Sequence, residues 1–560
     1  MTTSTTLQTI TLPNIIIKVI LEYLLNRVVE FDYLIDFIHR YTLISKKWNE
    51  EIIGKLKVNN SLTTTSCNYE LINKWNRLAD RYKVDYEVQL EVYKKTIENS
   101  EIRDRVVSIR NSIGLFTKDD YNYYKNIRDI SLKIKISIHE FEHDLPLLID
   151  YSKRVNHELT LFSDFSYPKL SEKVSETFFN QSIFKSLSLS YFTISEMNHH
   201  NELSLLQQLN LFSVVVSVDS LSSILSRSPN LFKLVLNEID IADGDYNIVL
   251  KLISNVSLKY QKLNHLLIHS NKYTVSYSSF VDLINTIKCQ NVDFRIVIES
   301  PEQNQLVIDN TSIEKFRIIL EQNYSKIDIF SIWKDKSNLR DIYLSTGVSI
   351  EDMNKLISLD TLHFHDDKMV SQVKIASLRE LKTKTCPIHT IKIILQNNIG
   401  ITKLDVFIMS AKKLAKILDS KSFPTLTSLV IKYVHPAERD INVDALLSLF
   451  QNNRNLQYIS IQNCKSISLK NPQEFVMSIL QVNSILISFI VHFNFTTNED
   501  KIEDNIDFNL LDTIFSNNRT IQKLLLPSTI SNDVNIIYSQ KLINIFNKHS
   551  VIRTTNVDDK

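Results

Sequence analysis

Residues Leu456–Cys464 read Leu-Gln-Tyr-Ile-Ser-Ile-Gln-Asn-Cys, a phrase of the form L-x-x-L-x-L-x-x-C with isoleucine at its second and third apolar positions. Phrases with this spacing recur along most of the chain. The clearest begin at Leu231, Leu263, Leu339, Leu426 and Ile521. Self-similarity at intervals of about 20 to 50 residues indicates a repeat architecture. The phrase therefore predicts an array of similar units, and it favours a protein that holds a partner over one that catalyses a reaction.

Each unit is predicted to contain one short strand and one helix. We anchor each repeat on the second apolar position of its phrase, and the anchors are Ile130, Leu159, Leu187, Leu209, Leu234, Leu266, Ile296, Ile327, Ile342, Leu362, Leu381, Leu404, Leu429, Ile459, Phe489 and Leu524. An apolar residue two positions after the anchor gives the period of a strand with one buried face. Helical spacing follows between the strands, for example over 221–225 and 316–320. Because Ile327 and Ile342 lie unusually close together, we expect one of these two anchors to be wrong.

These phrases resemble the leucine-rich repeat, L-x-x-L-x-L-x-x-N/C-x-L, over roughly residues 121–545. The resemblance implies an α/β solenoid, a leucine-rich-repeat horseshoe built of strand–turn–helix units. An ordinary α/β domain with a parallel sheet is the alternative. Such a domain would show long apolar strands and glycine-rich turns, whereas these strands are brief and the chain has only 5 glycines in 560 residues.

Composition excludes several classes of function. A formal net charge of +1 argues against a nucleic-acid binder. No glycine-rich phosphate loop occurs, so no nucleotide cofactor is expected. The four cysteines are far apart, which fits a reducing compartment. Without a signal-peptide pattern or an apolar run long enough to span a bilayer, we expect a soluble protein of the cytoplasm, or also of the nucleus, that binds no membrane.

The N-terminal segment predicts a helix with a broad apolar stripe. Proline suits the first turn of a helix, and here it precedes the run 14–25, in which apolar residues dominate one side. A second helical pattern over 42–53 carries a tryptophan on its apolar face. The width of the first stripe indicates contact with both its own domain and something else.

This segment resembles the F-box, which opens with Leu-Pro, continues with an "IL.YL" phrase and ends in "L-V-S-K-R-W". The matching stretches are Leu12-Pro13, Ile20–Leu24 and Leu43–Trp48. The connection over 26–40 is longer than usual for the family. The resemblance implies docking on a Skp-type adaptor of a cullin–RING ubiquitin ligase, through Leu12, Pro13, Ile16, Ile17 and Ile20. The alternative is a helical bundle that only caps the first repeat.

The expected domain organisation follows from these segments. It comprises a flexible tail over 1–10, an F-box-like helical domain over 11–58, a helical linker and N-terminal cap over 59–120, the repeat array over 121–545 and a second flexible tail over 546–560.

One motif suggests a metal site. His139, Glu140 and His143 match H-E-x-x-H, which binds zinc when two histidines lie one helical turn apart beside a glutamate base. The motif follows a strand-like run and is soon interrupted by Pro146, so we expect no long helix to carry it. Zinc metallohydrolase activity is therefore a remote alternative, and we predict no metal, no cofactor and no catalytic residues.

The residues between the inward apolar positions of each strand are predicted to face a partner. Mixed aromatic and charged side chains beside apolar ones are typical of protein interfaces. The expected target-binding residues are Tyr343, His363, Lys382, Asp405, Phe407 and Tyr458. The sequence thus favours a non-enzymatic substrate receptor of an SCF-type ubiquitin ligase that binds an unknown protein. A leucine-rich-repeat interaction scaffold without a ligase link is the second interpretation.

Overall fold

The computed structural model describes residues 14–25, 34–35, 37–39, 46–65, 69–92, 103–111, 118–135, 138–163, 167–194, 201–242, 244–299, 306–319, 330–344, 350–364, 372–383, 388–408, 425–433, 455–464, 477–481, 483, 485–493, 508–517, 521, 523–525, 545, 548–549 and 552–553. The chain divides into two compact units, Met1–Lys272 and Tyr273–Lys560, and each is described by itself.

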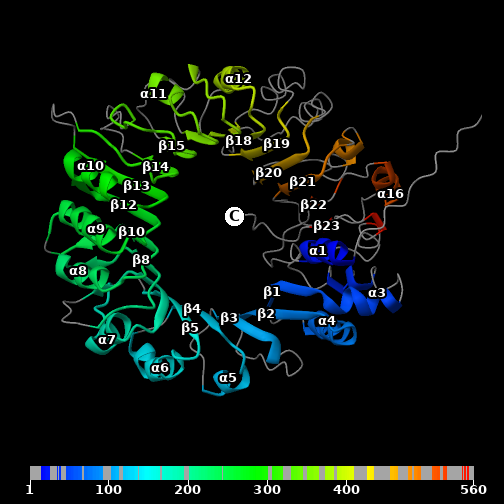
Figure 1. Cartoon of the computed structure of the whole chain (residues 1–560), viewed down its shortest axis with the longest axis horizontal. Helices are drawn as coiled ribbons and strands as arrows, with labels where there is room; N and C mark the ends of the chain where they lie inside the picture. Colours follow the sequence, from blue (N-terminus) through cyan, green and yellow to red (C-terminus); the bar gives the residue numbers. More distant parts are fainter. Residues whose placement is uncertain are drawn as a thin grey trace, which may run out of the picture. The chain divides into compact units, whose positions relative to one another are not determined.

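The first unit holds a long parallel sheet, and most of its helices lie along one side of this sheet (Figure 1). Its main strands are β1 (Lys57–Thr65), β2 (Asp85–Val92), β3 (Val106–Asn111), β4 (Asp129–Lys135), β5 (Asn156–Phe162), β6 (Phe184–Ser190), β8 (Gln208–Phe212), β10 (Lys233–Asn237) and β12, which begins in this unit (His265–Val275). Each strand pairs in parallel with the next in this order. A second, small parallel sheet joins β7 (Thr193–Ile194), β9 (Val215–Val216) and β11 (Asp240–Ile241).

Helices alternate with these strands. They are α1 (Asn14–Leu25), α3 (Lys46–Glu51), η1 (Ile53–Lys55), α4 (Tyr69–Tyr82), η2 (Arg103–Arg105), α5 (Lys118–Tyr123), α6 (Ile138–Tyr151), α7 (Glu172–Asn180), α8 (Val218–Ser226) and α9 (Tyr246–Tyr260). Ser171 and Ser217 each accept a backbone N–H of the first turn of α7 and α8, as N-cap residues do. In α8 the predicted face is buried.

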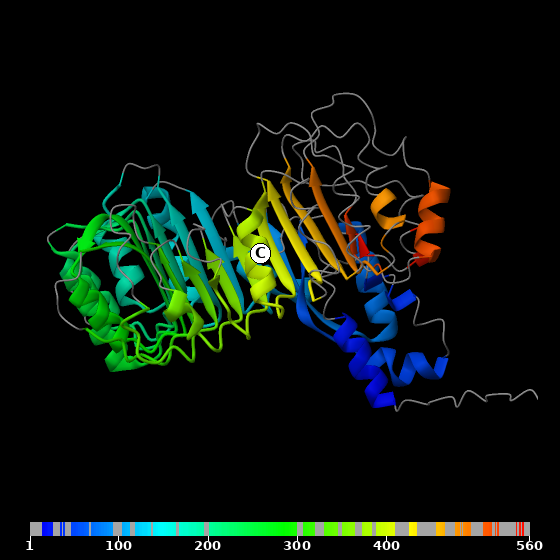
Figure 2. The same cartoon turned by 90° about the horizontal axis from the view of Figure 1, so that it is seen from above.

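The second unit repeats the same arrangement. Its strands are β13 (Asn291–Ile298), β14 (Lys315–Ile319), β15 (Asp341–Leu344), β16 (Thr361–Phe364), β17 (Glu380–Thr383), β18 (Lys403–Ile408), β19 (Ser428–Tyr433), β20 (Tyr458–Cys464), β21 (Ser488–Phe493), β22 (Lys523–Leu525) and β23 (Ile552–Arg553). They pair in parallel in chain order and stand side by side in Figure 2. The described helices are α10 (Tyr277–Thr286), α11 (Ile350–Asn354), α12 (Ile388–Asn397) and α16 (Phe508–Asn517). Sequential parallel pairing confirms the predicted α/β solenoid.

The register of the strands follows the anchors. Leu362, Leu381, Leu404 and Leu429 are opposite one another on β16 to β19, and all four are buried. A one-residue slip would turn every such side chain to the other face, so the apolar row fixes the pairing.

Two predicted anchors need correction. Leu132, rather than Ile130, is opposite Leu159. On β13 the residue opposite Phe316 is Val292, not Ile296. The predicted and the observed anchors are an even number of residues apart, so they lie on the same buried face of the strand. The apolar pattern alone therefore does not distinguish them.

From its sequence, the segment 316–320 is expected to be helical, but its residues 316–319 belong to the strand β14. Phe316 and Ile318 are buried between exposed Lys315 and Arg317, which is the alternation of a strand. β14 is thus a repeat strand that the apolar phrases did not predict, and it pairs with β15 through Phe316 and Ile342. Ile327 lies outside the described residues.

The segment 59–120, predicted as a helical linker and cap, contains strands as well as helices. β1 to β3 join the same parallel sheet as the later repeats, and the helices among the described residues of this segment are α4, η2 and the start of α5. Buried Val88, Leu90 and Ile109 alternate with more exposed residues on β2 and β3. The charged residues between them conceal this alternation from a search for leucine phrases.

A buried polar side chain recurs three residues before the first apolar position of a phrase. Asn310 Nδ2 donates to the Ile284 and Ile287 carbonyls at 2.5 and 2.6 Å, and Asn398 Nδ2 donates to the Val373 and Ile394 carbonyls at 2.8 and 2.7 Å. Other residues at this position are Ser228, Lys336 and Asn483, which donate to Ile224, Trp333 and Leu456 carbonyls. These side chains satisfy backbone groups where the chain returns from helix to strand.

We expect Asn398→Ala to lower the free energy of unfolding by about 2 kcal/mol, because it leaves the Val373 carbonyl and the Ile375 N–H without their side-chain partner. Gln396→Ala is the matched control, since Gln396 is exposed on α12. Urea unfolding of both variants measures the difference, and equal stabilities would contradict this role for Asn398.

His157 lies fully buried on β5, and burial lowers its pKa to about 4. Between about pH 4 and pH 6.5 the unfolded chain therefore binds a proton that the folded chain does not. We predict that acidification through this range destabilises the protein by up to about 3 kcal/mol through this residue. Urea titrations across this pH range should show a weaker pH dependence in His157→Gln than in the exposed-site control His389→Gln. An identical pH profile in the two variants would contradict the prediction.

Candidate functional site

Four of the predicted target-binding residues form one row across neighbouring strands. Tyr343, His363, Lys382 and Asp405 are successive register partners on β15 to β18. The row extends to Arg317 on β14. The structure therefore brings together residues that are far apart in sequence, because each occupies the same position of its repeat.

The other two predicted residues lie beyond this row. Tyr458 is on β20, in the row that begins each strand, and 44% of it is exposed. Phe407 follows two residues after Asp405 on β18, and its side chain lies outside the described part of the structure.

Ion pairs connect the charged side chains of this strand face. Arg317 Nε lies 3.6 Å from Asp293 Oδ1, and His363 Nε2 lies 3.3 Å from Asp341 Oδ1. Further pairs join Glu380 to Lys382 at 3.2 Å and to Lys403 at 3.0 Å, and Asp405 to Lys432 at 2.6 Å. Every described carboxylate among these pairs lies beside a lysine, arginine or histidine of a neighbouring or the same strand.

These ion pairs and the burial around them shift the pKa values of the carboxyl groups in different directions. Burial favours a raised pKa at Asp341, but the hydrogen bond and charge of His363 and the nearby lysines outweigh it, and the pKa is lowered. At Glu380, burial is likewise outweighed by Lys403 and Lys382, and the pKa is lowered. At Asp293, burial outweighs the charge of Arg317, and the pKa is raised. Asp341 and Glu380 are therefore held ionised by their partners.

Asp405 differs from the outward-facing group that its sequence position predicts. Only 8% of the residue is exposed, and Lys432 covers its charge. Tyr343 and His363 are half-buried, with the Arg317 guanidinium 4.4 Å from the centre of the Tyr343 ring. The charges of this face thus stabilise one another, and its aromatic groups remain partly available.

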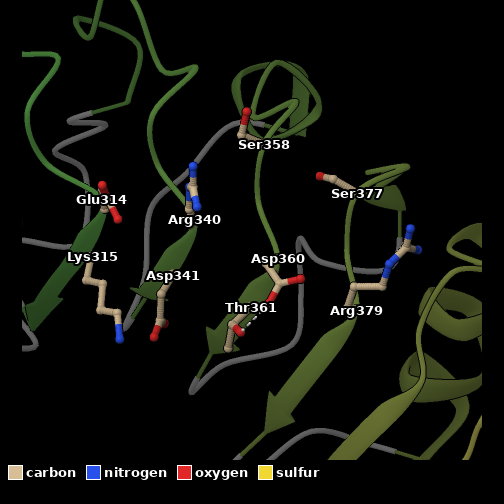
Figure 3. A pocket seen from close by; sticks show the side chains of 9 residues that line it. All are labelled: Glu314, Lys315, Arg340, Asp341, Ser358, Asp360, Thr361, Ser377 and Arg379. Atoms are coloured by element: carbon tan, nitrogen blue, oxygen red, sulfur yellow. Dashed lines mark hydrogen bonds between the residues drawn. The ribbon is translucent and has the colours of Figure 1, made fainter. Parts of the chain in front are cut away.

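A pocket of about 620 Å³ opens beside this face, where strands β14 to β17 begin (Figure 3). It is lined by Glu314, Lys315, Arg340, Asp341, Ser358, Asp360, Thr361, Ser377 and Arg379. Sequence reasoning did not single out this edge, because its residues precede the apolar phrase. Their common offset from the phrase was the signal that could have identified them.

A different surface is formed by α1. Ile15, Ile16, Val19 and Ile20 are 71, 44, 59 and 43% exposed, while Leu21 is buried. Ile17 is half-buried. Two hydrogen bonds hold the helix: Asn14 Nδ2 donates to Glu51 Oε2, and the Lys57 N–H donates to Glu22 Oε1. Leu12 and Pro13 lie outside the described residues.

The H-E-x-x-H motif lies on a helix, contrary to the expectation. His139, Glu140 and His143 belong to the N-terminal half of α6, and Pro146 lies inside that helix. Proline without a backbone N–H removes one helical hydrogen bond but need not end the helix. The side chains of the motif are outside the described part of the structure. Among the side chains that are described, no group of three or more potential metal ligands gathers.

Within the described segments, no helix is both long and apolar enough to cross a bilayer.

Comparison with known proteins agrees with the repeat geometry. Residues 150–318 match the family described as "FBD-associated F-box protein At5g56370, LRR repeats". The array is built of leucine-rich repeats. The matched residues contain strands β5 to β13 and all but the last residue of β14, and they do not include α1. No curated protein matches the sequence.

Several solved leucine-rich-repeat and related structures are similar to the chain at 13% identity. One is TLR13 in a complex with ssRNA13, with a TM-score of 0.38 over 84% of this chain and 66% of that one. The others are an internalin (inlF) from Listeria monocytogenes, with a TM-score of 0.26 over 63% and 80%, and the leucine-rich repeat-containing protein LegL7 from Legionella pneumophila, with a TM-score of 0.26 over 50% and 97%.

We predict that Lys432→Met lowers the free energy of unfolding by about 2 kcal/mol, because it leaves the buried Asp405 carboxylate without its cation. Lys403→Met should cost less than about 1 kcal/mol, since Glu380 keeps Lys382. Urea unfolding of the two variants checks this order, and equal losses would contradict it.

Proposed function

We propose that this protein is a non-catalytic substrate receptor of a cullin–RING ubiquitin ligase, with α1 docking on a Skp-type adaptor and the leucine-rich repeats holding a protein target. The exposed apolar stripe of α1 is the observation that carries the proposal. Four aliphatic side chains at successive turns of one helix face solvent there. Exposed apolar clusters of this kind mark interaction sites.

The sequence of this segment supports the identity of the partner. The stripe lies within the stretch that resembles the F-box, directly after Leu12-Pro13, and the repeats match an F-box-associated family. A helix that only capped the array would turn these side chains inward. An F-box in this position would place the protein in the cytoplasm or nucleus, where such ligases act.

Target binding is assigned to the strand face of the second unit. Tyr343, His363 and Lys382 offer aromatic and charged groups on neighbouring strands, and Tyr458 adds an aromatic group farther along the sheet, on β20. We include Phe407 and Asp405, the latter as a support for Lys432. The receptor would act by proximity, raising the effective concentration of its target at the ligase.

An interaction scaffold without a ligase link is the second candidate. The repeat architecture alone supports it, because the array presents a binding face whether or not α1 has a partner.

Binding of purified full-length protein to a Skp-type adaptor separates the two. We expect Ile16→Gln with Ile20→Gln to weaken adaptor binding about ten-fold or more, because the change removes aliphatic contact area at the centre of the stripe. Glutamine keeps the helix propensity, so the fold should be retained. Isothermal titration calorimetry supplies the affinities.

Ile248→Gln with Leu258→Gln is the matched control. Both residues are exposed on α9 to a similar degree, at 47 and 56%, and the change should leave adaptor binding intact. Failure of the unsubstituted protein to bind any Skp-type adaptor would overturn the ligase proposal and leave the scaffold.

A further inference from the structure

The residues that immediately precede β14, β15, β16 and β17 form a row of alternating charge. We call Glu314, Arg340, Asp360 and Arg379 the edge row. Each backbone carbonyl in the row accepts two N–H groups from the next repeat, as Glu314 does from Arg340 and Asp341 at 2.8 and 3.1 Å. This regular backbone holds the four side chains at the strand spacing of about 4.8 Å.

The alternation is confined to four consecutive repeats. The corresponding residue before β13 is Gln290, and those before β18, β19 and β20 are Thr402, Thr427 and Gln457. The four charges all line the pocket of about 620 Å³ (Figure 3). Charge alternation and the hollow therefore coincide at one place on the edge.

Within the described structure, the charges of the edge row are not paired with opposite charges as those of the strand face are. No ion pair joins any two members of the edge row, or a member to another described residue. Among the described residues, Arg379 Nη1 donates to the Gly400 carbonyl, at 3.2 Å, and Asp360 Oδ2 accepts from Thr361 Oγ1, at 3.4 Å. Arg340, Asp360 and Arg379 are exposed, and Glu314 is half-exposed. The row thus presents two carboxylates and two guanidinium groups to solvent.

The spacing of the row selects the secondary structure of a partner. Three strand intervals span about 14 Å. Three turns of an α-helix span about 16 Å, whereas four same-face residues of an extended chain span about 20 Å. Long Arg and Glu side chains can bridge the small difference in length between the row and a helix. They cannot bridge the larger difference between the row and an extended chain.

We propose that the edge row is a docking site for an α-helix of a partner protein that carries basic and acidic residues in alternation, one turn apart on one face. Its lysine or arginine side chains pair with Glu314 and Asp360, and its carboxylates pair with Arg340 and Arg379. Ile357, 71% exposed and next to the pocket residue Ser358, contacts an apolar residue beside the charged face. This site needs no adaptor, so its failure and the failure of the ligase proposal are separate results.

The test uses a set of alanine-based helical peptides, with lysine or glutamate at positions i, i+4, i+7 and i+11, and full-length protein. Peptides of order Lys-Glu-Lys-Glu or Glu-Lys-Glu-Lys should bind about ten-fold more tightly than Lys-Lys-Glu-Glu or Lys-Glu-Glu-Lys, as several exposed charge pairs add up. Both alternating orders fit, because a helix can lie across the row in either direction. All four peptides are neutral, so bulk attraction cannot produce the difference. Fluorescence anisotropy gives the affinities, circular dichroism gives the helicity of each free peptide, and the preference should fade at high salt.

Arg340→Glu with Arg379→Glu makes the whole row acidic and should transfer the preference to an all-lysine peptide. Lys288→Glu with Lys392→Glu is the control: it makes the same change in net charge at exposed positions away from the row and should keep the preference for alternation. Thermal unfolding confirms that both variants fold.

Three results would overturn the proposal. The first is equal binding of alternating and non-alternating helices. The second is an alternating preference that survives the double reversal at Arg340 and Arg379. The third is tighter binding of an extended, proline-containing peptide with the same charges at every second residue.

Discussion

Parallel pairing in a fixed register is the constraint on which the remaining structure depends. Each strand of a repeat must offer its backbone groups to both neighbours, and this works only if the apolar side chains of all strands fall on one face. Leu362, Leu381 and Leu404 satisfy that condition on three successive strands. Once they do, any other position in the repeat also lines up across strands. Rows of side chains, rather than single residues, become the functional elements.

The turns that return from helix to strand impose a second demand. Their backbone carbonyls are buried and need donors, and asparagine supplies two N–H groups from a short side chain. Asn310 and Asn398 meet this demand in different repeats, while Lys336 does so elsewhere with its ammonium group. Because several residue types can serve, the position is not recognisable as a motif, although its offset from the phrase is constant.

Charged side chains on the strand face and those just before each strand behave differently. On the strand face, Glu380 lies between two lysines and Asp405 against Lys432, so the charges stabilise the sheet. One residue earlier, Arg340 and Asp360 lie at the rim, where side chains diverge into solvent. Neighbouring opposite charges there gain little from pairing, because water screens them. The charges on the strand face thus form ion pairs that stabilise the sheet. Those of the edge row, one residue earlier, remain available to a partner.

The sequence determined the array and most of its register, because the spacing of apolar residues reports directly which side chains must be buried. It also determined that Tyr343, His363 and Lys382 are neighbours, since equivalent positions of successive repeats must align. It misassigned β14, because Phe316 and Ile319 fit a helical period while Phe316 and Ile318 fit that of a strand. It missed β1 to β3, where charged residues obscure the phrase.

Only the tertiary structure decided which polar residues are available. Whether Asp405 meets solvent or Lys432 depends on a residue 27 positions away on the next strand. The exposure of Ile16 and Ile20 likewise depends on what packs against α1. Local pattern specifies the face on which a side chain lies, but burial and pairing are set by neighbours that are distant in sequence.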